Sequence, residues 1–138
     1  MEDAELRQAI SVAESYKQRV EALSRQVQVL RVSLDEVTMA SNALKAFRDA
    51  KDGDEIMVPV GASSFVIATV TSKRKAVVGI GNKVSIDMDL DDAAKYMATG
   101  AEEVQEAIKK LNDAIQEMNA KARELSLAVQ QEYQRRQQ

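Results

Sequence analysis

The sequence predicts an α+β protein, in which a long antiparallel two-helix coiled coil is joined by two β-hairpins. Apolar or small residues recur every three or four positions in both the first and the last third of the 138 residues, while the middle third holds short valine-rich and isoleucine-rich runs between turn residues. Only 4% of residues are aromatic and five are glycine, which favours helix-on-helix packing over a large compact core. We treat residues 1–138 as a single domain, with helices at 1–48 and 89–138 and hairpins at 49–88.

The segment 1–48 carries the heptad seam of a coiled coil. An apolar stripe with a period of about 3.5 residues keeps facing a partner helix as the pair supercoils. The seam positions are spaced alternately three and four residues apart, and they are Leu6, Ala9, Ala13, Tyr16, Val20, Leu23, Val27, Leu30, Leu34, Val37, Ser41 and Leu44. This spacing predicts one long helix.

The segment 49–88 reads as four strands in two hairpins. The strand-like runs are Glu55 to Val60, Phe65 to Thr71, Ala76 to Ile80 and Val84 to Met88, each bounded by turn residues. Pro59 has no N–H to donate to a ladder, so its strand lies at a sheet edge or at an interruption. We read the basic run 73–75 between the second and third strands as a solvated turn that blunts an edge.

Two short hairpins on a thin helical pair hold too little sheet to be stable alone in water, so their edges and apolar faces need partners. The run Phe65 to Ala68 is apolar without alternation, which is typical of a strand covered on both faces. Closing the hairpins of several subunits into a shared intersubunit β-barrel would remove the open edges. The expected oligomerisation residues are Val58, Val60, Phe65, Val66, Ile67, Val77, Val78 and Ile80.

The segment 89–138 repeats the seam, and Asp89 is the expected helix cap. Its seam positions are Leu90, Ala94, Met97, Ala101, Val104, Ile108, Leu111, Ile115, Met118, Ala122, Leu125 and Val129. Each helix would be about 70 Å long at about 1.5 Å per residue. Equal lengths favour antiparallel pairing within the chain, and parallel pairing between chains is the alternative.

The composition excludes several functions. The chain has no cysteine and no histidine, so it lacks thiolate ligands and the usual general base. Its acids near Asp89 lack the glycine and glutamate of a calcium loop, and Gly79 and Gly81 lack the third glycine of a dinucleotide loop. We expect no enzyme, no metal and no cofactor. The net charge of −3 argues against nucleic acid, and the absence of apolar spans or a secretion signal argues against a membrane and for the cytoplasm.

The tip of the predicted coiled coil, where both termini would meet, has apolar residues off its seam. Ile10 and Val12 flank a seam weakened by small alanines, and Leu127 and Tyr133 lie off the opposing seam, which ends at Glu132. With Leu6 they form the expected client-binding set, which we call the tip residues. The alternative is that scattered surface apolar groups are ordinary; Val29, Val32 and Met39 are also off the seam, with no assigned role.

The joining segment resembles the alpha-class prefoldin subunits. The residues that carry the resemblance are Met57-Val58-Pro59-Val60-Gly61, Ser64-Phe65-Val66, Ala76-Val77-Val78-Gly79-Ile80-Gly81 and the acidic helix entry 87–94. The chain departs from the family at its last turn, where Gly81-Asn82-Lys83-Val84 replaces the common Gly-Thr-Gly and an aromatic residue.

The resemblance implies a hexamer of two alpha-type and four beta-type chains, whose coiled coils extend from a β-barrel platform. It implies an ATP-independent holdase that captures unfolded proteins at the coiled-coil tips and delivers them to a group II chaperonin. A coiled-coil structural scaffold is the alternative, and it would need a seam equally good to both ends and no client surface.

Overall fold

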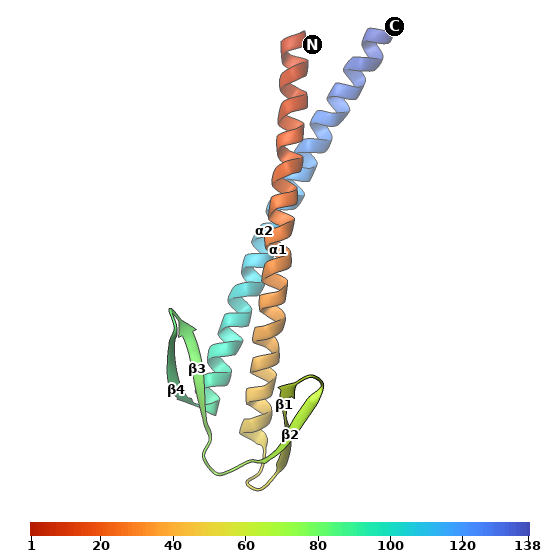
Figure 1. Cartoon of the computed structure of the whole chain (residues 1–138). Helices are drawn as coiled ribbons and strands as arrows, with labels where there is room; N and C mark the ends of the chain where they lie inside the picture. The colour runs from red at the N-terminus through yellow and green to blue at the C-terminus, as the bar shows by residue number, and fades with distance from the viewer. The chain divides into compact units, whose positions relative to one another are not determined.

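The computed structural model describes all 138 residues and confirms the predicted fold class. Along the chain, four strands lie between two long helices (Figure 1). The elements are α1 (Asp3–Asp49), β1 (Glu55–Gly61), β2 (Ser64–Thr69), β3 (Lys75–Gly81), β4 (Val84–Asp89) and α2 (Leu90–Gln137). The chain divides into two compact units. Unit 1 holds residues 1–33 and 104–138, unit 2 holds residues 34–103, and each is described by itself.

The predicted seam is confirmed along both helices. Every one of the twelve seam positions of α1 and the twelve of α2 is buried or half-buried, including the small residues Ala13, Ser41 and Ala94. Residues between the seam positions are mostly exposed, as Val29 and Met39 show at 69% and 71%. A heptad pattern therefore predicted the buried face of each helix residue by residue, because helical period alone decides which side chains share a face.

In unit 1 the beginning of α1 lies beside the end of α2, which makes the helices antiparallel. The Arg136 guanidinium lies 2.7 Å from Asp3 Oδ1 and donates a hydrogen bond of 2.8 Å to the Met1 carbonyl. These contacts join residues of one chain, so they argue against parallel pairing between chains. The buried apolar side chains of unit 1 are Leu6, Ala13, Val27, Ile108 and Ala122.

In unit 2 the end of α1 lies beside the beginning of α2. A Cβ built on Gly100 would lie 3.7 Å from Val37 Cγ1, so the two helices approach closely where the glycine has no side chain. Near the helix ends, Arg48 lies 3.5 Å from Asp91 Oδ1. The exposed fractions of Ala93 and Ala94 are 0% and 3%, and such small side chains permit this close packing.

The four strands form two separate two-stranded antiparallel sheets, β1 with β2 and β3 with β4. The strand bounds agree with the sequence prediction within two residues; the largest difference is β2, which ends at Thr69 rather than Thr71. The Val70 N–H leaves the ladder and donates to the Asp54 carbonyl at 2.8 Å. Pro59 pairs with Phe65 immediately before a register shift in β1, as expected for a residue without an N–H.

Both hairpins turn through two residues in the left-handed region. The φ angles are 49° at Ala62 and 58° at Ser63, and 50° at Asn82 and 62° at Lys83. Positive φ at both central residues defines a type I′ turn, whose twist matches that of the flanking strands. The family departure at Asn82 and Lys83 is therefore compatible with a tight turn.

Candidate interaction surfaces

The hairpins expose most of their predicted oligomerisation residues. Seven of the eight are between 39% and 74% exposed, namely Val58, Val60, Phe65, Val66, Ile67, Val77 and Ile80. The eighth, Val78, is 2% exposed and packs within its own chain, on the same strand face as the half-buried Ala76. Val78 therefore supports the fold of the single chain, and the other seven form what we call the hairpin surface.

Strand β2 is exposed on both faces from Phe65 to Ile67 within this chain. The neighbouring side chains of Phe65, Val66 and Ile67 point alternately to the two faces, yet they are 53%, 53% and 68% exposed. Contiguous exposed apolar groups of this kind mark surfaces that other molecules cover. The chain thus leaves uncovered the strand for which the sequence predicts cover on both faces.

The basic run 73–75 is not a solvated hairpin turn. Lys73 and Arg74 lie in the linker between β2 and β3, and Lys75 begins β3. The Arg74 guanidinium donates to the carbonyl oxygens of Phe47 at 3.2 Å and Ala50 at 2.8 Å. The Arg74 carbonyl in turn accepts a hydrogen bond of 3.3 Å from the Leu90 N–H. A single residue therefore serves the last carbonyls of α1 and the first N–H of α2, which otherwise have no intrahelical partners.

Lys75 and Asp89 close the base of the second hairpin. They are register partners across β3 and β4, and Lys75 Nζ lies 2.9 Å from Asp89 Oδ1. The hydrogen bond to Asp89 and the charge of its carboxylate raise the pKa of the Lys75 ammonium. Asp89 stands directly before α2, where an N-cap was expected, but its carboxylate binds Lys75 rather than a helix N–H.

Three of the five tip residues are exposed in unit 1. Ile10 is 42% exposed, Leu127 52% and Tyr133 49%, while Val12 is half-buried. Leu6 is only 6% exposed, because it occupies the seam, and it offers no surface to a client. Ile10 lies seven residues from Asp3 and Leu127 nine residues from Arg136, so both are within about three helical turns of the contact between Asp3 and Arg136.

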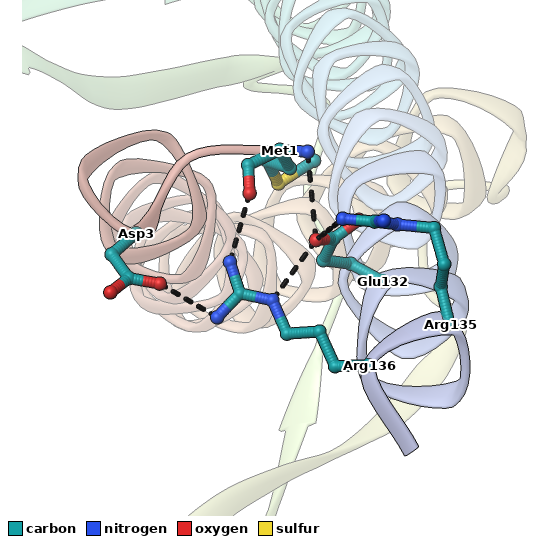
Figure 2. A network of polar contacts seen from close by, with 5 residues as sticks. All are labelled: Met1, Asp3, Glu132, Arg135 and Arg136. Atoms are coloured by element: carbon teal, nitrogen blue, oxygen red, sulfur yellow. Dashed lines mark hydrogen bonds and ion pairs between the residues drawn. The ribbon is translucent and has the colours of Figure 1, made fainter. Parts of the chain in front are cut away.

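The seam of α2 ends at the buried carboxylate of Glu132 (Figure 2). The Glu132 side chain is 8% exposed, and its Oε1 lies 2.6 Å from Arg135 Nη2, 3.0 Å from Arg136 Nε and 3.5 Å from the Met1 ammonium. Hydrogen bonds from Arg135 and then Arg136 lower the pKa of Glu132 to about 2. We call Glu132, Arg135, Arg136 and Asp3 the terminal cluster, which joins the two helix ends.

Sequence reasoning recognised Glu132 only as the place where the seam stops. A usable signal is nevertheless present, since Arg135 and Arg136 follow it by three and four residues, the spacing at which helix side chains meet. The contact of Arg136 with Asp3 has no such signal, because those residues are 133 positions apart.

No set of three or more carboxylates, histidines or cysteines is arranged to hold a metal ion. Neither helix is both long and apolar enough to span a bilayer. The structure therefore presents three kinds of feature, namely the hairpin surface, the tip residues and the ion pairs that hold helix ends together.

The chain thus combines a coiled coil with two hairpins whose apolar side chains are largely exposed. The family model described as "Prefoldin subunit" matches residues 16–135, so the chain belongs to the prefoldin subunit family. Its likeness is to the alpha subunits: it is 30% identical over 121 residues to "Prefoldin subunit alpha" of Thermofilum pendens, which covers 86% of this chain and 94% of that protein. Membership places the chain among chaperone subunits, not enzymes.

Two solved structures share the fold. Filamentous prefoldin of Methanocaldococcus jannaschii, determined by cryo-electron microscopy, matches with a TM-score of 0.69 at 24% identity, covering 86% of this chain and 98% of that one. The crystal structure of the prefoldin beta subunit of Thermococcus strain KS-1 matches with a TM-score of 0.60 at 17% identity, covering 92% and 90%. At these identities the likeness concerns the fold.

Proposed function

We propose that this prefoldin subunit is an ATP-independent holdase that binds unfolded polypeptides through its tip residues. The observation that carries the proposal is the exposure of Ile10, Leu127 and Tyr133 beside the joined helix ends of unit 1, in a chain of a chaperone family. Covering such side chains removes apolar area from water and gains about 25 cal/mol per Å². This attraction has no sequence requirement, which suits clients that share only exposed apolar groups.

The hairpin surface supports assembly. The seven residues of the hairpin surface lie on two isolated two-stranded sheets, whose edges and faces are left to be covered by neighbours. We propose that they close with hairpins of beta-type subunits into a β-barrel, in a hexamer of two alpha-type and four beta-type chains. Several tips held on one platform would bind a client with avidity, which offsets the weakness of each contact.

Two further steps belong to the proposal. The bound client passes to a group II chaperonin without nucleotide hydrolysis, and the protein acts in the cytoplasm. A surface that binds each apolar group weakly can release its client to the chaperonin without nucleotide hydrolysis. A larger apolar surface on the chaperonin would then compete for the client.

The test is light scattering of a chemically unfolded client diluted into buffer with the complex of this chain and a beta-type partner, without ATP. We expect strong suppression of aggregation, and we expect Ile10→Ser with Leu127→Ser to reduce it severalfold while the complex still assembles. Tyr96→Ser is the matched control, because Tyr96 is 42% exposed on α2 outside the tip residues.

The outcomes separate the alternatives. Loss of assembly in the tip variant would contradict a division of labour between the tip residues and the hairpin surface. An assembled complex that leaves aggregation unchanged would make a coiled-coil scaffold the better description.

A further inference from the structure

The face of α1 opposite the seam carries an apolar and basic stripe in unit 1. It consists of Gln18, Ala22, Arg25, Val29 and Val32, spaced alternately four and three residues apart, and we call it the outer stripe. Val29 and Val32 are 69% and 60% exposed. Branched side chains lower helix propensity, so two exposed valines cost the helix stability without contributing to its seam.

The outer face of α2 in the same unit is a natural comparison. Its positions are Glu106, Lys110, Asp113, Glu117, Ala120 and Glu124, five charged residues and one alanine. That composition is typical of a solvated coiled-coil face. The outer stripe of α1 has one charge, Arg25, and therefore departs from what solubility alone requires.

The α1 segment that carries the outer stripe has an excess of cations. Arg25 lies in the stripe, Arg19 and Glu21 flank it on either side, and Lys17 and Arg31 lie beside the seam. Residues 15–33 contain the four cations Lys17, Arg19, Arg25 and Arg31 and the single anion Glu21, a net of +3 in a chain whose total is −3. None of the four cations takes part in the ion pairs of the structure, which lie elsewhere, as at Arg136 and Lys121. Arg25 precedes Val29 by four residues, so both lie on one helix face, and they line the same shallow groove with Ala22 and Leu30.

The outer stripe also continues toward the tip residues. A second shallow groove on α1 is lined by Arg7, Ile10, Ser11, Glu14, Ser15 and Gln18, and Gln18 is where the outer stripe begins. A polypeptide bound at Ile10 therefore meets a helix surface within unit 1 that leads to Val32 and is exposed except at the half-buried Ala22.

We propose that the outer stripe is a second client-binding surface that selects acidic, apolar segments of non-native polypeptides. The apolar part of such a segment covers Val29 and Val32, and its carboxylates pair with Arg25 and Arg19. This inference rests on the proposed holdase function and adds a substrate class to it. A second copy of the chain is a poorer occupant, because the outer face of α2 is acidic but has no large apolar side chain between Glu106 and Glu124.

The test uses two short fluorescein-labelled unfolded peptides with the same leucine and valine positions, one with glutamate and one with lysine elsewhere. Fluorescence anisotropy measures their affinity for the assembled complex at low and high salt. We expect the acidic peptide to bind about tenfold more tightly at low salt, and the preference to shrink as salt screens exposed charges.

Two variants locate the preference. Arg25→Glu should lower the affinity for the acidic peptide about three- to tenfold. Arg123→Glu makes the same charge reversal at an exposed position of α2 and should leave this affinity nearly unchanged. Val29→Ala with Val32→Ala should lower the affinity for both peptides. Because alanine is the better helix former, lost binding in this variant cannot result from an unfolded helix.

The outcomes distinguish this inference from the proposed function. Equal affinity for both peptides, or equal effects of Arg25→Glu and Arg123→Glu, would overturn the proposal that the outer stripe binds acidic segments. The tip residues would then still account for aggregation suppression. Failure of the complex to bind either peptide or to suppress aggregation would overturn the holdase itself. Self-association that is lost in Val29→Ala with Val32→Ala would assign the outer stripe to a second copy and overturn the inference.

Discussion

Glu132 shows how one residue can both end a seam and hold it together. A carboxylate at a seam position is costly to bury unless it is paired, and this one is bound by Arg135 and Arg136 from its own helix. Arg136 also reaches Asp3 and the Met1 carbonyl, so the pairing extends to α1. The terminal cluster thus joins the helix ends that carry the exposed tip residues.

The ionised form of Glu132 contributes stability that depends on pH. Its pKa is about 2 in the folded chain against an ordinary 4.5, so the contribution is complete above about 4.5 and is lost as pH falls toward 2. We expect Glu132→Gln to lower the melting temperature of the complex, followed by circular dichroism, near neutral pH. The difference from wild type should shrink as the pH falls below about 4.

Glu124→Gln is the control for this prediction, since Glu124 is exposed and lies outside the ion pairs of the terminal cluster. Equal melting temperatures for Glu132→Gln and wild type near neutral pH would show that the terminal cluster adds nothing to stability. A shift of similar size in Glu124→Gln would attribute the effect to net charge.

At the scale of an element, Gly100 is the weakest position in α2. Glycine inside a helix costs about 1 kcal/mol relative to alanine, because its backbone loses the most freedom on folding. The added Cβ of alanine would meet Val37 Cγ1 at 3.7 Å, an ordinary van der Waals distance. The helix therefore has room for a side chain that it lacks.

We expect Gly100→Ala to raise the free energy of unfolding by about 0.5–1 kcal/mol, measured by urea denaturation. The opposite change is expected for Gly81→Ala, because Gly81 has a φ of 110°, which strains any residue with a Cβ. A loss of stability in Gly100→Ala would indicate that the helices of unit 2 need a closer approach than the structure shows.

At the scale of the whole molecule, the chain is folded, but many of its apolar side chains remain exposed. Its helices bury their seam, while the hairpins leave side chains such as Phe65, Ile67 and Val77 in water. Two-stranded sheets with apolar faces are marginal alone and prone to aggregate, so their stability depends on the partner that covers them. We therefore expect other subunits to cover the hairpins of this chain.

A pair of variants separates assembly from chain stability. Ile67→Ser should weaken the complex with a beta-type partner, seen as dissociation in size-exclusion chromatography with light scattering, because Ile67 is 68% exposed in the single chain. Val78→Ala should instead lower the free energy of unfolding by about 1–3 kcal/mol, because Val78 is buried at 2% exposure. If Ile67→Ser assembles fully and with unchanged affinity, β2 is not part of the interface.

The sequence by itself determined the elements and their buried faces. The seam positions, the strand runs and the turns follow from local periodicity and turn chemistry, so the helices, hairpins and strand bounds agree with the structure within two residues. The likeness to a family could also be recognised from the sequence, because the motifs of the joining segment are local runs of residues in its strands and turns.

Only the tertiary structure decided which of those residues meet across the chain. It buried Leu6 and Val78, which the sequence placed among the interaction residues, and it brought Arg74 to the ends of both helices and Arg136 to Asp3. Such contacts join positions far apart in sequence, and no local pattern encodes them. The physical reason is that period decides which face a side chain occupies, whereas burial and pairing depend on what the fold places opposite that face.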